Sequence, residues 1–151
     1  MATHVLTGAG TSVSTYSPAI TASTATVSLQ ATTVFVPAVA CADFPLRFLV
    51  SNLIQGTYAT SCTGPITSPE LTGTLHWSDS TTSEYTVTHD TAERVEGHLV
   101  GHVQGTITSG HYTGATVHAL SLRLATNVAA CLTGSSVSTS SGWDVLVVTK
   151  P

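Results

Sequence analysis

The sequence predicts an all-β fold. A single domain over residues 1–151 would hold about eight strands in an antiparallel meander, closed as a barrel or folded as a sandwich. Hydrophobic residues make up 42% of the chain and charged residues only 8%. Thr, Ser and Gly replace the missing charge, and Thr and Val are β-branched residues that favour strands. Apolar and polar side chains alternate with a period of two, which is typical of half-buried strands.

The first two predicted strands are each ended by a proline. Residues 4–16 alternate until Ser17-Pro18, because proline cannot donate a hydrogen bond to a strand ladder. Residues 23–36 form the second strand, which Pro37 ends. The face of this strand predicted to point inward carries Ala25, Val27, Leu29 and Phe35.

The third predicted strand covers residues 45–61, with a kink near Asn52 or Gly56, and a loop with two prolines follows at 62–70. The fourth strand puts Leu71, Leu75 and Trp77 on one face. Glycines inside several strands indicate curvature or bulges, which a small barrel requires. From the fourth onward, the predicted strands are 71–77, 83–90, 94–108, 115–126 and 137–149.

The charge of the chain bears on its partners and its compartment. The net charge is −4 with only four Lys and Arg, so no basic stripe for nucleic acid can form. No apolar run approaches the roughly 20 residues of a transmembrane helix, and no membrane insertion is predicted. Low charge with much Thr, Ser and Gly favours an extracellular protein whose signal peptide has been removed. The alternative is a cytosolic protein that starts at Met1.

Three cysteines, Cys41, Cys62 and Cys131, have spacings that match no zinc or redox motif. In a meander the loops alternate between the two ends of the structure, which places Cys62 and Cys131 at one end and Cys41 at the other. A disulfide needs Cα atoms within about 7 Å of each other. We therefore predict a Cys62–Cys131 disulfide, with Cys41 as a buried free thiol or a link to another chain.

Three stretches, TGTLHWSDSTTSEYTV, GTITSGHYTGATV and AACLTGSSVSTSSG, resemble motifs of a group of small exported actinobacterial proteins rich in Thr, Ser and Gly. The resemblance covers roughly residues 57–148 and implies an exported, all-β domain that contains a disulfide. It implies no activity. The chain departs from the pattern in its histidines and at Ser80, where the group usually has glycine.

Residues 97–120 hold four of the seven histidines. On a strand, His98 and His102 are about 13 Å apart, too far to chelate one ion through zinc–nitrogen bonds of about 2.1 Å. If residues 109–111 form a three-residue turn, His102 faces His118 across the strands. A turn of two or four residues would point His118 away from His102. We predict no bound metal, with His102 and His118 as the fallback ligands.

No catalytic motif and no cofactor are predicted. The chain has no G-x-S-x-G nucleophile motif, and nothing suggests the pair of acids that a glycosidase uses. Trp77, Tyr85 and Trp143 are candidate binding residues, because exposed rings can stack on sugars. The competing interpretation is a core position, since Trp77 continues the face of Leu71 and Leu75, and Trp143 shares a face with Val145 and Val147.

The first function predicted is a non-catalytic exported β-module for binding or assembly, with a surface, a glycan, a protein or a second copy as partner. The alternative is a small barrel with an internal cavity, which binds or cyclises an apolar small molecule without a cofactor. Eight strands leave just enough room for one small ligand. The packing of the interior distinguishes the two functions.

Overall fold

The computed structural model describes residues 3–35, 40–41, 48–62, 67–95, 98–123, 134 and 136–151. All regular elements within these ranges are strands, as predicted, and no helix there could span a membrane. In chain order they are β1 (Thr3–Ile20), β2 (Ala25–Phe35), β3 (Ala40–Cys41), β4 (Leu49–Thr60), β5 (Thr67–Trp77), β6 (Thr82–Val95), β7 (His98–Gly110), β8 (Thr116–Arg123) and β9 (Val137–Lys150).

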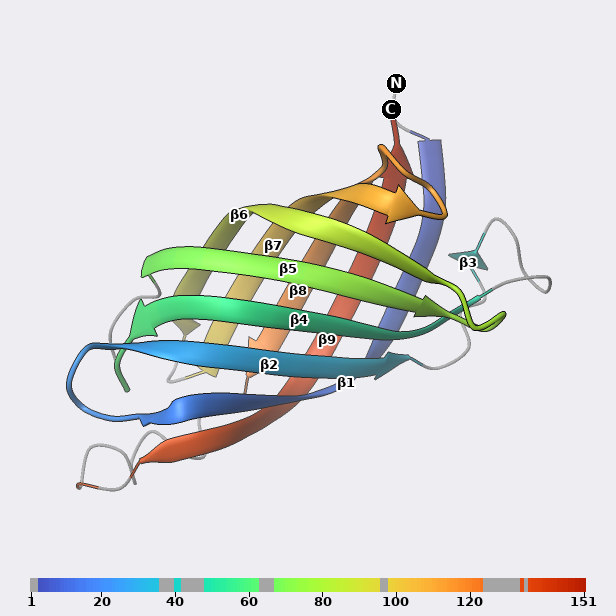
Figure 1. Cartoon of the computed structure of the whole chain (residues 1–151). Helices are drawn as coiled ribbons and strands as arrows, with labels where there is room; N and C mark the ends of the chain where they lie inside the picture. Colours follow the sequence, from blue (N-terminus) through green and yellow to red (C-terminus); the bar gives the residue numbers. More distant parts are fainter. Residues whose placement is uncertain are drawn as a thin grey trace.

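The strands form a closed antiparallel barrel. From β4 to β9 each strand pairs with the next, and β2 pairs with β4. β1 closes the ring because it pairs with β2 on one side and with β9 on the other. In Figure 1, β2, β4 and β5 lie in front of β7, β8 and β9, which form the opposite wall. The predicted meander is therefore confirmed, and it is closed as a barrel.

Several strands extend beyond their predicted ends. β1 continues past Pro18, although its pairing with β9 is irregular between Thr15 and Ile20. β5 begins at Thr67, inside the predicted loop, because Pro69 lies at a register shift, where the ladder does not need its missing N–H. The expected kink corresponds to that same shift, which falls between Thr57 and Ala59 of β4, next to Gly56.

Aromatic rings fill much of the interior. Tyr16, Phe35, Tyr58, Trp77 and Tyr85 are buried there together with Leu and Val side chains in one cluster. Glycines on neighbouring strands make room for these rings. A Cβ built at Gly73 would overlap the Tyr85 ring, and one built at Gly105 would lie 2.9 Å from its Cδ2. These strand glycines therefore provide space for aromatic packing.

Buried polar groups inside the barrel are paired with one another. Asp144 is only 4% exposed, and its carboxylate accepts hydrogen bonds from the hydroxyls of Ser12, at 3.5 Å, and Thr33. The Tyr85 hydroxyl donates to Oδ1 of Asn52 at 2.8 Å. Unpaired, such groups would be costly to bury, so this pairing is what makes a polar interior tolerable.

The cysteine positions follow the alternation of loops. The Cys62 N–H donates to the Thr21 carbonyl at 2.9 Å, which places Cys62 at the end of the barrel where β1 finishes. Cys41 pairs with Leu6 near the start of β1. At about 3.2 Å per residue the two cysteines are on the order of 45 Å apart, too far for a disulfide. Cys131 lies outside the described residues.

A Gly73→Ala substitution is expected to destabilise the protein by about 1–3 kcal/mol, because the new methyl group overlaps the buried Tyr85 ring and overpacks the core. Gly101→Ala is the matched control. Gly101 lies on β7, two strands away from Gly73 on β5, and a Cβ built there would meet nothing closer than 3.7 Å. Urea denaturation of both variants measures the difference. Equal stability of the two would contradict the packing of Tyr85 on Gly73.

The Cys62–Cys131 disulfide stays a prediction. It would close a loop of about 70 residues and stabilise the fold by roughly 4 kcal/mol on a chain-entropy estimate. Peptide mapping without reductant is expected to give one Cys62–Cys131 peptide, with Cys41 either alkylated or joined to another chain. A Cys41–Cys62 peptide would be incompatible with the strand order of the barrel.

Candidate binding site

Trp77 and Tyr85, two of the three predicted binding residues, lie inside the barrel. Trp77 is 3% exposed, its Nε1 donates to the Ser83 hydroxyl at 2.8 Å, and its ring meets that of Tyr112 edge to face at 5.5 Å. Tyr85 is 1% exposed. Neither ring is available to stack on an external ligand. Trp77 therefore has the core position that its strand face indicated.

The Tyr85 hydroxyl is held in its neutral form. Burial raises the pKa of this phenol far above its ordinary value, and the negative charge of Asp144 raises it further, although the hydrogen bond to Asn52 acts in the opposite direction. The raised pKa keeps the proton on the hydroxyl, which therefore acts as a hydrogen-bond donor. Its contribution is the internal hydrogen bond to Asn52.

Trp143, the third predicted binding residue, points outward. Its side chain is 51% exposed, and Val145 beside it on β9 is 40% exposed. The core interpretation of Trp143, Val145 and Val147 is therefore wrong. The opposite face of β9 points inward and carries Asp144, Leu146 and Val148. Apolar residues occupy both faces of this strand. A charged residue usually faces solvent, so the position of Asp144 suggested the wrong face as the outer one.

Trp143 belongs to a continuous apolar area on the outer face of β7, β8 and β9. Val100, Leu122 and Trp143 follow one another across these strands, and Leu120 and Val145 are paired in the adjacent row. Leu120 is 54% exposed and Val100 is 38% exposed. We call these five residues the Trp143 surface. A side-by-side set of exposed Leu, Val and Trp side chains is typical of an interaction site.

Uncharged residues surround the centre of the Trp143 surface. Trp143 has Leu122 and Thr11 as its cross-strand neighbours. Val145 has Leu120 and Ala9. The apolar character continues on β1 with Val13 and on β2 with Val34, which are 55% and 57% exposed. The only sequence signal for this surface was that residues 115–126 and 137–149 are apolar on both faces, which half-buried strands do not require.

The two fallback metal ligands lie next to the Trp143 surface. His102 pairs with Leu120, and Gln104 pairs with His118, so the histidines are diagonal neighbours on the outer face. Their rings are parallel, at 4°, with centroids 5.8 Å apart. None of the turn lengths considered, of two, three or four residues, occurs, because a longer connection with left-handed backbone at Gly110, Tyr112 and Gly114 joins β7 to β8. The two histidines share a face, as the three-residue turn would have placed them, but they are not directly opposite each other. In the described part of the chain, no three His, Cys, Asp or Glu side chains are grouped to hold a metal ion.

Asp79 caps the hairpin turn that joins β5 to β6. Its Oδ1 accepts a hydrogen bond from the Thr81 N–H at 3.1 Å, and its Oδ2 lies 3.7 Å from Nε2 of His111. Ser80 in the same turn has a φ of 69°. Glycine adopts this left-handed conformation most readily, which is the usual reason for glycine in such three-residue hairpin turns. These contacts hold the turn between β5 and β6 in place.

Among the carboxylates that the structure describes, Asp90 of β6 has the most strongly shifted pKa. Burial raises its pKa to about 6, and the positive charge that His102 can carry lowers it in part. Asp90 pairs with Val103, whose side chain is buried in the barrel wall. Desolvation is therefore the main cause of the raised pKa.

No protein-family model matches the chain, and no curated protein or solved structure shows significant similarity to it. The features that bear on function are therefore those of the barrel itself. They are a packed interior with paired polar groups and an apolar area on the outer wall.

Asp90→Asn is expected to stabilise the protein at pH 7 and to have no effect at pH 4. The folded state binds the Asp90 proton more tightly than the unfolded chain does, so wild-type stability falls as the pH rises from about 4 to about 6. Asparagine stays neutral and avoids this loss. Because the side chain is partly exposed, we expect a gain on the order of 1 kcal/mol.

Thermal denaturation of the wild type and Asp90→Asn at pH 4 and pH 7 measures this effect. Glu84→Gln is the control, because Glu84 lies on the same strand and its side chain is exposed. It is expected to change stability by less than about 0.5 kcal/mol at either pH. A gain from Asp90→Asn that is the same at both pH values would show that ionisation of Asp90 is not its cause.

Proposed function

We propose that this chain is a non-catalytic, exported β-module for binding or assembly, and that the Trp143 surface is its contact with another protein or with a second copy. The observation that carries the proposal is the exposure of Trp143 and Leu120, at 51% and 54%, in adjacent rows of the outer wall formed by β7, β8 and β9. Monomeric proteins seldom expose such side chains together unless a partner covers them.

The chemistry of the surface favours a protein partner. Burial of apolar area yields about 25 cal/mol per Å², and Trp is among the residues that dominate binding energy at protein interfaces. The cross-strand neighbours of Trp143 and Val145 are uncharged, so the centre of the surface places no like charges opposite each other when a second copy lies face to face. Such a contact would depend weakly on salt, because screening acts on charges.

The interior supports a function on the outside of the barrel. Tyr16, Phe35, Tyr58, Trp77 and Tyr85 occupy the space in which an internal ligand would lie. The polar atoms among them bond to one another, as Tyr85 does to Asn52. These side chains favour a binding or assembly module over a barrel that encloses and cyclises an apolar small molecule.

Sedimentation velocity tests whether the Trp143 surface binds a second copy of the chain. We expect wild-type protein to self-associate between micromolar and millimolar concentration. Replacing both Trp143 and Leu120 by serine is expected to weaken association at least tenfold, because loss of a buried aromatic anchor costs about 2 kcal/mol or more. Neither substitution should unfold the barrel, since both side chains are outside it.

Val50→Ser is the matched control, because Val50 is 40% exposed on β4, outside the Trp143 surface. It is expected to associate like the wild type. A wild-type chain that stays monomeric to millimolar concentration, and whose retention on a hydrophobic-interaction column equals that of the double variant, would contradict the proposal.

A further inference from the structure

The wall opposite the Trp143 surface carries a groove of different chemistry. It has a volume of about 540 Å³ and is lined by residues of β1, β2, β4 and β5. Most of the lining side chains are exposed and polar. Among the described residues that line the groove there is no Lys, Arg or His, and Glu70 is the only one with a charged side chain.

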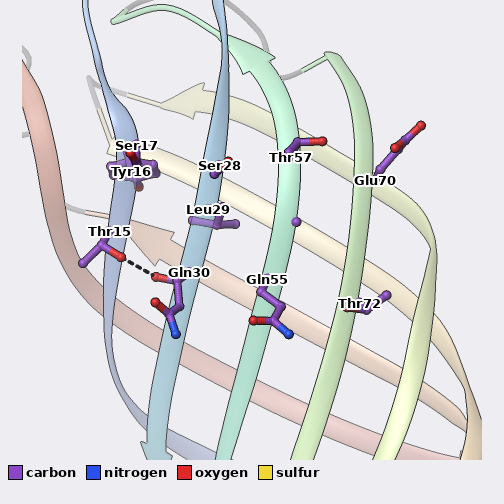
Figure 2. A pocket seen from close by; sticks show the side chains of 11 residues that line it. Thr15, Tyr16, Ser17, Ser28, Leu29, Gln30, Gln55, Thr57, Glu70 and Thr72 are labelled. Carbon is purple, nitrogen blue, oxygen red and sulfur yellow. Dashed lines mark hydrogen bonds between the residues drawn. The ribbon is translucent and has the colours of Figure 1, made fainter.

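The polar side chains of the groove stand in two rows across the strands. The first row runs Thr15, Gln30, Gln55 and Thr72, each paired with the next. The second row, made in the same way, is Ser17, Ser28, Thr57 and Glu70. Figure 2 shows Gln30 and Gln55 on adjacent strands with their carboxamides extending in the same direction. The Thr15 hydroxyl donates to the backbone carbonyl oxygen of Gln30 at 3.3 Å. This hydrogen bond does not involve the side-chain carboxamide of Gln30.

A glycine lies between the two rows. Gly56 pairs with Leu29 on one side and with Leu71 on the other, and it has a φ of 152°. A Cβ at this position would overlap the backbone carbonyl of Glu70. Leu29 packs against the core and Leu71 is buried, so the row that contains Gly56 faces inward. On the outer face, only backbone therefore lies between the two polar rows, where a ligand can reach it.

We propose that this groove binds a neutral glycan. Each Ser or Thr hydroxyl can donate and accept a hydrogen bond, and each Gln carboxamide does both with separate atoms. A saccharide offers donors and acceptors of the same two kinds along one face. Two carboxamides one strand apart can hold successive hydroxyls, and a groove of this volume lies within the usual range for ligand sites.

Charge and polarity exclude other ligand classes. A phosphate, sulfate or acidic sugar would meet the carboxylate of Glu70 and find no cation in the groove. The net charge of −4 also disfavours an anionic ligand. An apolar ligand would cover Gln30 and Gln55 without satisfying their hydrogen bonds, which costs free energy. The glycan site shares no residue with the Trp143 surface, so either proposal can fail alone.

Titration of the full chain, followed by nuclear magnetic resonance, tests the site. The neutral probes are tetrasaccharides of α- and β-linked glucose, N-acetylglucosamine, mannose and xylose, and the acidic probe is tetragalacturonate. At least one neutral probe is expected to shift the side-chain amide signals of Gln30 and Gln55. Replacing both by alanine is expected to weaken its binding at least tenfold, while Trp143→Ser leaves it unchanged.

Gln104→Ala is the matched control, because Gln104 is a glutamine on the outer face of the opposite wall, beside His118. Its affinity for the saccharide should equal that of the wild type, and denaturation curves should confirm that all variants are folded. The proposal is overturned if no neutral probe shifts the two glutamines, if tetragalacturonate binds more tightly than every neutral probe, or if the double alanine variant binds as well as Gln104→Ala.

Discussion

The simultaneous pairing of β1 with β2 and with β9 is the constraint on which the rest of the structure depends. Successive residues of a strand point to opposite faces, so every strand in a closed ladder must agree with both neighbours about which residues face inward. Once Ser12 and Ser14 of β1 face inward, the pairing with β1 determines which residues of β9 face inward. Its pairing with β1 and β8 puts Leu146 and Val148 in the core, and with them Asp144.

The inward carboxylate of Asp144 requires a polar interior. The hydroxyls of Ser12 and Thr33 donate to it, from the two strands that follow β9 around the barrel. The cost of burying a charge is reduced only when such donors are present, and they must lie on inward positions of β1 and β2. The same closure places the bulky Tyr85 opposite Gly73, and Tyr85 reaches Asn52 on β4. Closure, the buried carboxylate and the strand glycines are therefore coupled.

The fold could be predicted from the sequence because period-two alternation and the turn residues are local signals. They located eight strands, and most inward residues of 23–36 and 71–77 are indeed buried. The orientation of β9 could not be predicted, because Trp143, Val145 and Val147 are as apolar as Leu146 and Val148. A local pattern does not contain the hydroxyls of Ser12 and Thr33, more than a hundred residues away, that make Asp144 tolerable inside. The relation of His102 to His118 depended in the same way on a turn whose left-handed residue at Tyr112 has no sequence signal.

The same constraint determines where a function can reside. Because rings, strand glycines and paired polar groups occupy the interior, a change of inward residue disturbs several strands at once, as the overlap of a Gly73 methyl group with Tyr85 illustrates. Outward side chains do not fill the interior, so a change at such a position disturbs the closure of the barrel less than a change at an inward one. The outer wall is therefore where this barrel can carry both an apolar contact at Trp143 and a polar groove at Gln30 and Gln55. With only 8% charged residues in the chain, the two walls differ mainly in hydrogen-bonding capacity, and this difference would direct one partner to each wall.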